Sequence, residues 1–284
     1  MSVMLVSRPV VPEPATAVGF ALLGPLEVYC YGTAVPTGPR QRRQLLLRLL
    51  IAKGQFVSPA RLCDDLWDGF PPSGALSAVR AHVSRLRTAL GRTPQVPAEL
   101  VSGPLGYALR VSPDLVDSHH FERAVTNAGA LLDGGRAGAA VQEAEHALGL
   151  WRGPALADAA DHGFAAEEIW RLDELRCVAE ETLIAGLLAT GRAERAIVAA
   201  RALTRRQPLR ESAWVLLLEG LGVAGRPAEA MREYCQVRGL LQTELGLMPG
   251  PELRRAAVAL QGGTDRPAPG GRRPGTGSRY ASLS

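Results

Sequence analysis

Residues 77–91 of this 284-residue chain read SAVRAHVSRLRTALG, a helix-length stretch in which arginines lie beside a regular apolar repeat. At 100° per residue, the apolar side chains recur every three or four positions, as on the buried face of an amphipathic helix. The predicted core-facing stripe consists of Leu76, Val79, Val83, Leu86 and Leu90. The stretch therefore predicts a helix with one buried face and one face that is free to bind a ligand.

The face opposite the stripe carries one long cation among small side chains. Its residues are Ser77, Ala81, Ser84, Arg85 and Thr88. Small side chains let a helix backbone lie deep in a nucleic-acid groove, and the fork of an arginine fits guanine O6 and N7. We therefore expect Arg85 to contact bases. The flanking side chains, Arg80 and Arg87 on one side and His82 on the other, are expected to contact phosphates.

The sequence before this helix predicts strands and two further helices. Residues 20–38 alternate between apolar and polar and are broken by glycines, which is typical of short antiparallel strands. Residues 39–54 predict a helix that begins with Pro39. Ser58 precedes a proline and predicts the N-cap of the second helix, while the third runs from about position 74 to 90.

After the third helix, residues 99–111 predict a hairpin with its turn at Gly103–Gly106. Strands, three helices and a closing hairpin make a winged helix-turn-helix domain, for which we predict the bounds 18–111. Trp67 and Tyr107 can belong to the core of this domain, or each can direct its single polar side-chain atom at a phosphate. The sequence leaves that choice open.

The rest of the chain predicts stacked helices. Gly191-Arg192 and Gly225-Arg226 lie 34 residues apart, and Ala196 and Ala230 keep the same offset. Thirty-four residues is the tetratricopeptide period, in which small side chains let paired helices approach closely. Gly135-Arg136 predicts a third such turn. Because a repeat needs neighbours to bury its apolar face, we predict one all-α domain over residues 112–261 and a mostly α chain.

Charge differs along the chain. Residues 18–111 hold eleven basic and five acidic side chains, whereas residues 112–262 hold sixteen and twenty-one. A basic N-terminal third joined to an acidic middle favours a polyanion as the ligand of the first domain. Residues 1–17 and the Gly/Pro/Arg-rich residues 262–284 are predicted to be a disordered leader and tail.

The four cysteines are far apart, so the sequence predicts neither a disulfide framework nor a metal site, and it indicates no cofactor. We interpret them as buried free thiols in a reducing compartment. No apolar run is long enough for a membrane span, and the N-terminus lacks the pattern of a signal peptide. The sequence therefore predicts a cytoplasmic protein without a membrane partner.

Two groups of segments resemble one known family. FALLGPLEV, RLCDDLWDGFPPSGALSAVRAHVSRLRTALG and LVSGPLGYALRV are similar to the OmpR-type DNA-binding domain of the Streptomyces antibiotic regulatory protein family. HALGLWRGPALAD and RRQPLRESAWVLLLEGLGVAGRPAEAMREYCQVRGLLQTELGLMPGPELR resemble the bacterial transcriptional activation domain of that family, which has a tetratricopeptide-like fold. Together these resemblances cover about residues 18–261.

The resemblance implies a transcriptional activator of a secondary-metabolite, often antibiotic, gene cluster. It makes the helix with Arg85 the recognition helix, places Ser58 and Arg87 near phosphates, and makes Ser102–Tyr107 a wing in the minor groove. The implied partners are promoter DNA, bound through direct repeats by a head-to-tail homodimer, and RNA polymerase holoenzyme with its sigma factor. Gly103 stands where related wings often carry a basic or polar residue, so we expect weaker minor-groove readout.

Other classes of function are less well supported by the sequence. H-E-x-x-H and G-x-S-x-G motifs are absent, and so is the phosphate-binding loop of the ATPase module found in larger relatives. Asp158, Asp161 and His162 resemble an acid/base cluster, but a loop before a helix explains them equally well. A helical adaptor whose winged helix binds protein, and a repressor that occludes a promoter, both stay open.

Overall fold

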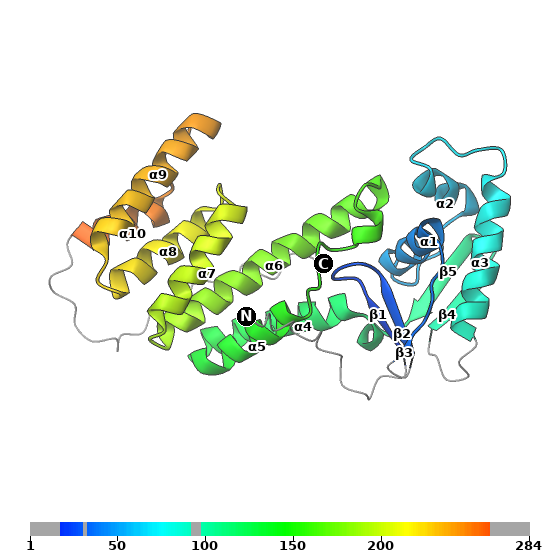
Figure 1. The fold of residues 1–284 in the computed structure, drawn as a ribbon, viewed down its shortest axis with the longest axis horizontal. Coiled ribbons are helices and arrows are strands. Elements are labelled where there is room, and N and C mark those ends of the chain that lie inside the picture. Colours follow the sequence, from blue (N-terminus) through cyan, green and yellow to red (C-terminus); the bar gives the residue numbers. More distant parts are fainter. Residues whose placement is uncertain (1–17, 31–32, 92–97, 262–284) are drawn as a thin grey trace, which may run out of the picture.

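The computed structural model describes residues 18–30, 33–91 and 98–261; the predicted leader and tail lie outside the described residues. Within this part the chain forms a small α/β unit followed by a stack of helices (Figure 1). The chain is mostly helical, which confirms the predicted fold class.

The first unit is a winged helix-turn-helix. Three short antiparallel strands in the order β1-β2-β3 precede three helices, and a hairpin of β4 and β5 closes the unit. The bounds are β1 Val18–Ala21, β2 Glu27–Cys30, β3 Thr33–Ala34, α1 Arg40–Ile51, α2 Pro59–Leu66, α3 Ala75–Gly91, β4 Ala98–Gly103 and β5 Gly106–Val111.

Local sequence signals set several of these boundaries. Ser58 caps α2, because its side chain accepts a hydrogen bond from the backbone N–H of Arg61 at 3.1 Å. The hairpin register pairs Gly103 with Gly106, as the position of the turn predicts. Gly106 has a φ of +128°, and its neighbour Tyr107 exchanges two backbone hydrogen bonds with Val57. The wing is thereby attached to the segment that leads into α2.

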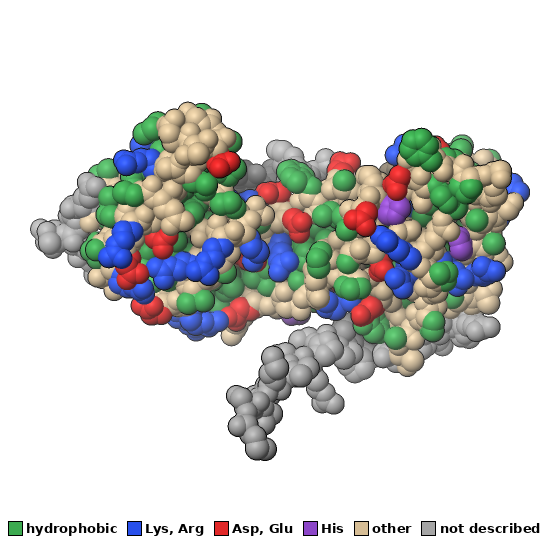
Figure 2. Space-filling view, turned by 45° about the horizontal axis from the view of Figure 1, so that its top comes forward, with side chains coloured by type: hydrophobic (Ala, Val, Ile, Leu, Met, Phe, Trp, Pro, Cys, Tyr) green, Lys and Arg blue, Asp and Glu red, His purple; other side chains and the backbone are tan. Residues whose placement is uncertain are grey.

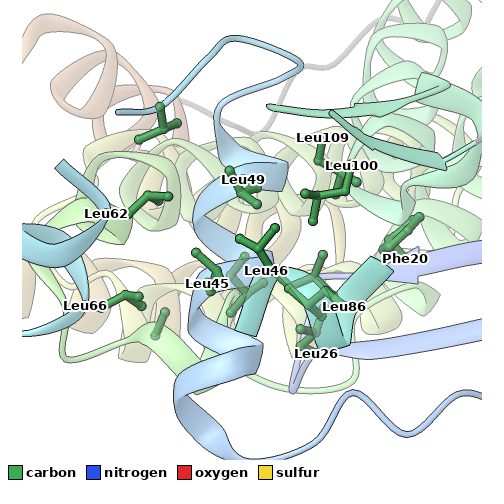
Figure 3. Packing of buried hydrophobic residues seen from close by; sticks show 14 of the residues in the cluster. Phe20, Leu26, Leu45, Leu46, Leu49, Leu62, Leu66, Leu86, Leu100 and Leu109 are labelled. Atoms are coloured by element: carbon green, nitrogen blue, oxygen red, sulfur yellow. The ribbon is translucent and has the colours of Figure 1, made fainter. Parts of the chain in front are cut away.

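Side chains from all three helices and both sheets meet in one core (Figure 3). Leu45, Leu46 and Leu49 of α1 lie at its centre and are fully buried. Full burial of such a side chain contributes roughly 1.5–3 kcal/mol, so α1 is the main apolar support of the unit. Figure 3 shows Leu86 of α3 against this helix, so the core fixes which side of α3 faces outward.

The predicted stripe of α3 is wrong at its first position. Val79, Val83, Leu86 and Leu90 are buried, but the side chain of Leu76 is 40% exposed. Ala75 is buried instead. Leu76 lies at one edge of the stripe in the helical projection, and the buried arc extends from the opposite edge because α1 covers that side.

The second unit consists of three helical pairs and a last helix. The pairs are α4-α5, α6-α7 and α8-α9, and α10 packs on α8 and α9. The bounds are α4 Asp117–Asp133, α5 Ala137–Gly149, α6 Gly163–Ala189, α7 Ala193–Arg206, α8 Glu211–Val223, α9 Pro227–Leu245 and α10 Pro251–Gln261, with single turns η1 Pro113–Leu115 and η2 Ala157–Ala159.

The three pairs share one turn. Gly135, Gly191 and Gly225 have φ values of +72°, +75° and +71°, a region that glycine adopts without strain. The arginine after each glycine donates its backbone N–H to a leucine carbonyl five residues earlier, at 2.8 Å in all three turns. The irregularly spaced turn at Gly135-Arg136 is therefore equivalent to the other two.

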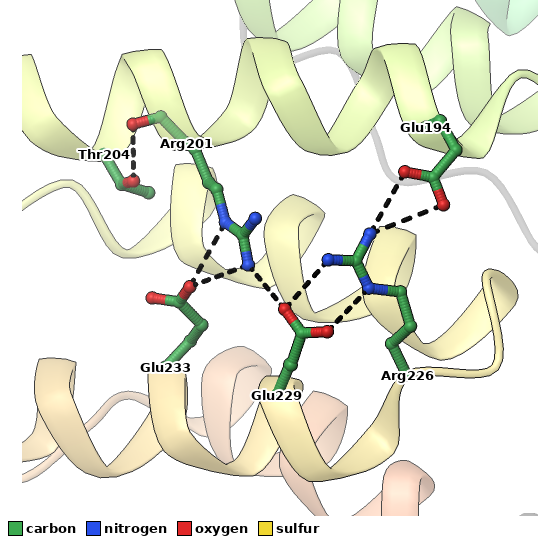
Figure 4. Close-up of polar contacts among 6 residues, drawn as sticks. All are labelled: Glu194, Arg201, Thr204, Arg226, Glu229 and Glu233. Atoms are coloured by element: carbon green, nitrogen blue, oxygen red, sulfur yellow. Dashed lines mark hydrogen bonds and ion pairs between the residues drawn. The ribbon is translucent and has the colours of Figure 1, made fainter.

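Ion pairs link successive pairs along the surface (Figure 4). Arg226 bonds Glu229 and also reaches Glu194 on α7, and Arg201 of α7 reaches Glu229 and Glu233 on α9. Hydrogen bonds from Arg226 and Arg201 lower the pKa of Glu229 to about 2. Exposed pairs of this kind contribute little singly, but as a network they fix the register of α9 on α7.

The two units share one hydrophobic core. Leu115, Val116, Leu156, Ala159 and Ala165 belong to the same buried cluster as the winged helix, although they follow residue 111. The hydrophobic core therefore crosses the predicted boundary at 111/112.

Two carboxylates of the second unit bind the backbone of the first. Asp117 accepts hydrogen bonds from the N–H groups of Leu22 and Leu23 at 2.7 and 3.1 Å. Asp158 accepts from the N–H of Leu26 at 2.8 Å and pairs with Arg43 at 2.6 Å. Burial raises the pKa of Asp117 to about 6 in spite of these donors.

The neighbours of Asp158 also contact the winged helix. Arg40 pairs with Asp161 at 3.0 Å, and His162 Nδ1 lies 3.1 Å from Asp68 Oδ1. The three polar residues that resemble an acid/base cluster in the sequence are thus spread along the contact between the two units.

We predict that Gly106→Ala destabilises the protein by about 2 kcal/mol or more, because the new Cβ would collide with the carbonyl of Val57 in a backbone conformation that L residues avoid. Gly129→Ala is the matched control: Gly129 lies within α4 with open space around it, and alanine there should add about 0.5–1 kcal/mol. Thermal and urea unfolding measure both variants. Equal stability of the two variants would contradict the conclusion that the wing is anchored on Val57.

Candidate nucleic-acid interface

The outward face of α3 is arranged as its sequence predicts. Ser77, Ala81, Ser84, Arg85 and Thr88 are all exposed. Thr88 donates its hydroxyl to the carbonyl of Ser84 at 3.1 Å, which folds that side chain back on the helix. Arg85 is therefore the one long side chain on this face, and the side chains around it are small.

His82 does not lie on this outward face. It is 8% exposed, and its Nε2 lies 3.3 Å from the amide oxygen of Gln41 on α1. Burial, with the nearby charges of Arg42 and Arg85, lowers the pKa of His82 below its ordinary value. The predicted phosphate-facing position of His82 is wrong because α1 covers that side of α3. The neutral imidazole instead joins the two helices.

Arg42 is a cation that the sequence reasoning missed. It lies on α1, close enough to His82 for its charge to disfavour the imidazolium, as does the charge of Arg85. Its Nε is buried without a hydrogen-bond partner among the described residues. The run Arg-Gln-Arg-Arg at 40–43 carries the signal, but only packing shows that α1 brings this arginine beside α3.

Arg87 connects α3 to the wing. Its Nε donates to the carbonyl of Leu100 at 2.9 Å, and its Nη2 donates to Ser102 Oγ at 2.7 Å. Both acceptors lie on β4, so the planar guanidinium spans two positions of one strand. Arg80, which is exposed on the same side of α3, has no such contact among the described residues. Arg87 therefore sets the position of the wing relative to the helix.

The tip of the wing is apolar. Leu105 is 72% exposed, and Gly103 is partly buried, with the ring of Phe56 where its Cβ would lie. A groove of about 630 Å³ separates the tip from the end of α1 and the start of α2. Arg48, Lys53, Ser58 and Arg61 contribute its polar lining. Ser58 is exposed there, so this candidate residue belongs to a basic surface beside the wing.

Trp67 and Tyr107 are partly buried against the core. Trp67 ends α2, and Tyr107 lies in β5 beside Val57. Within the described residues, neither the indole N–H nor the phenol forms a hydrogen bond, although buried groups of this kind usually do. The rings therefore pack on the core, as the first interpretation expects, and contact of either polar atom with a phosphate stays a prediction.

The described residues show no metal cluster and no membrane span. No group of three or more metal-ligating side chains comes together in that part of the chain, and none of its helices has the length and apolarity needed to cross a bilayer. Cys63 and Cys177 are buried free thiols, but Cys235 is exposed, so the expectation of buried cysteines is wrong for that residue.

Two family models match the chain. One, described as "Bacterial transcriptional activator domain", matches residues 116–261, and one described as "Transcriptional regulatory protein, C terminal" matches residues 33–109. The two matches divide the chain between the helical stack and the winged helix.

Curated relatives carry the same pair of units. Transcriptional regulator RedD of Streptomyces coelicolor is 35% identical over 82% of this chain and 67% of its own length. Regulatory protein DnrI of Streptomyces peucetius is 31% identical over 87% and 94%. Transcriptional regulatory protein EmbR of Mycobacterium tuberculosis is 34% identical over 83% of this chain, which spans 61% of the length of EmbR.

A solved structure has the same fold. Mycobacterium tuberculosis EmbR in complex with a low-affinity phosphopeptide matches with a TM-score of 0.80 and 33% identity, over 86% of this chain and 65% of that one. A winged helix that presents an arginine-bearing face, joined to this helical stack, defines a transcriptional regulator. The chain belongs to the Streptomyces antibiotic regulatory protein family of transcriptional activators.

We predict that Arg87→Ala weakens binding to every DNA sequence alike, by about 1 kcal/mol, because it releases the wing from α3 and removes a charge. Arg87→Lys keeps the charge but cannot span Leu100 and Ser102, so it should recover only part of the lost affinity. Arg80→Lys is the control and should bind like the unmodified protein. Mobility shifts on cognate and scrambled duplexes measure these effects. Full rescue by Arg87→Lys would show that only its charge matters.

Proposed function

We propose that this regulator binds promoter DNA in a sequence-specific way and activates transcription by contacting RNA polymerase holoenzyme, including its sigma factor. In this proposal α3 enters the major groove and the wing approaches the minor groove. The observation that supports this proposal most is the exposure of Arg85 among small side chains. Its helix is fixed on both sides, by Gln41 of α1 and by the strand β4.

The contacts of the proposed interface divide into readout and positioning. Arg85 reads a guanine through its fork. Ser77, Ala81, Ser84 and Thr88 permit close approach of the helix, and Arg80, Arg87, Ser58, Trp67 and Tyr107 surround the backbone. Ser102 and Gly103 form the wing, with little polar chemistry for base readout. We add Arg42 at the α1 edge and leave out His82, which is buried.

The second unit supports activation better than DNA contact. Residues 112–262 carry an excess of acidic over basic side chains, which repels phosphates, and stacked helices offer protein-binding surfaces. The controlled genes, by family, belong to a secondary-metabolite cluster. A truncation near residue 112 does not test this division, because it would remove Leu115, Val116 and Leu156 from the core of the winged helix.

We predict that Arg85→Ala abolishes discrimination between the operator and a scrambled duplex, at a cost of about 1–3 kcal/mol for one base pair. Arg85→Lys keeps the charge without the fork, so it should retain affinity for scrambled DNA and lose the preference. An operator selected from a random duplex library allows the comparison. Arg205→Ala, an exposed arginine on α7, serves as the charge-matched control. Full sequence preference in Arg85→Ala would refute the assigned readout.

We predict that two copies bind direct repeats head-to-tail with half-sites about one turn, roughly 10–10.5 bp, apart. Insertion of about 5 bp turns one copy to the opposite side of the duplex, so cooperative binding and activation should be lost. Insertion of a full turn should restore part of both. Footprinting and transcription with purified holoenzyme measure the two spacings. Equal activity at both would show that each copy acts alone, and a fall in transcription on binding would indicate a repressor.

A further inference from the structure

Helix α6 is much longer than the helices it packs with. It has 27 residues, whereas α7 and α8 have 14 and 13. Its second half packs on α7 and α8, while its first half crosses from the winged helix toward the later pairs (Figure 1). One side of the first half of α6 is therefore not covered by α7 and α8, which cover the same side of the second half.

An apolar row continues from the covered half into the uncovered half. Trp170, Cys177 and Ile184 follow one another at intervals of seven residues, which places them on one side of α6. Ile184 is fully buried and Cys177 is 3% exposed, both in the cluster formed with α7 and α8. Trp170 is 63% exposed. The side of α6 that packs on α7 and α8 therefore continues toward the start of the helix, where it ends in the exposed Trp170.

A row of carboxylates runs beside the apolar row with the same interval. Glu167, Glu174 and Glu181 are also seven residues apart. Arg210, at the start of α8, bridges two of them, with distances of 2.8 Å to Glu174 and 2.6 Å to Glu181. Glu167 has no ion pair with any described residue. The chain itself thus shows how an arginine from a packed helix fits between two carboxylates of this row.

The open end of α6 is acidic. Asp173 also lacks an ion pair within the described residues, and burial raises its pKa above the ordinary value in spite of the charges of Arg176 and Arg206. Asp161 and Asp68, near the start of α6, also have largely exposed side chains, although Asp161 pairs with Arg40 and Asp68 contacts His162. Figure 2 shows acidic side chains along the hollowed stretch between the two ends of the molecule. This charge disfavours DNA and favours a basic protein segment.

We propose that the first half of α6 binds a basic amphipathic helix of a partner protein. An apolar side chain of that helix covers Trp170, and an arginine or lysine lies between Glu167 and Glu174, as Arg210 does one heptad further on. Exposed tryptophan within a charged rim is typical of the centre of a protein interface. Resting on the proposed function, we assign this helix to RNA polymerase holoenzyme.

Surface variants of the full chain test the assignment. Trp170→Ala and the double variant Glu167→Lys with Asp173→Lys should each reduce holoenzyme-dependent transcription at least tenfold. Their operator affinity and melting temperature should stay close to those of the unmodified protein. The matched control is Asp133→Lys with Glu244→Lys, two exposed carboxylates at the ends of α4 and α9, and it should keep full activity. Full activity of both test variants would overturn the proposal.

A synthetic probe separates this surface from the proposed function. A labelled three-heptad peptide with leucine at the a and d positions and arginine at e and g should bind the unmodified protein and the control variant. It should bind Trp170→Ala and the charge-reversed variant at least tenfold more weakly. Equal binding of the peptide to the unmodified protein, the control and both test variants would refute the proposed binding surface. Selective binding without any activation by holoenzyme would support the surface and refute the proposed function.

The identity of the occupant is tested by a photo-crosslinker. Replacement of Trp170 by p-benzoylphenylalanine in the full chain, followed by irradiation with purified holoenzyme on operator DNA, should yield a cross-link to a polymerase subunit. A cross-link to a second copy of this chain, or to its own residues 262–284, would overturn the assignment of the partner.

Discussion

The arrangement of this protein depends on two partly buried carboxylates that bind backbone N–H groups far away in the sequence. Asp117 receives the N–H groups of Leu22 and Leu23, and Asp158 receives that of Leu26 and the side chain of Arg43. Such charge-assisted hydrogen bonds are stronger than neutral ones, and loss of the acceptor would leave buried donors without partners. They hold the first sheet of the winged helix on the helical stack.

The shared core has a consequence for function. Because apolar residues on both sides of position 111 pack in one cluster, α3 and α6 belong to one body. A partner bound at the first half of α6 would therefore have a set position relative to DNA bound at α3. In the proposed function, the distance between the promoter site and the polymerase is then set by the fold.

Within that body, α3 has contacts on two sides, and the face between them is exposed. On one side Gln41 contacts His82, and on the other Arg87 reaches two positions of β4. The small side chains between them contribute little packing of their own, so the exposed face is available for a groove. Arg42 adds a positive charge at one edge, which extends the surface from one helix to two.

Much of the local structure follows from the sequence alone. The periodicity of residues 77–91, the Ser58 cap, the Gly103–Gly106 turn and the glycine-arginine turns of the repeat act within a few residues, so they predict helices, hairpin and stacked pairs. The small-residue face around Arg85 is determined in the same way, since helix geometry alone decides which residues share a side.

Only the tertiary structure decided how wide each buried face is. α1 buries His82 and leaves Leu76 at an open edge, because the position of a neighbouring helix is not contained in the period of α3. The bonds of Asp117 join residues about 95 positions apart and have no local signal. The exposure of Trp170 has the same cause: its heptad row is continuous in sequence, but α8 begins too far along the stack to cover it.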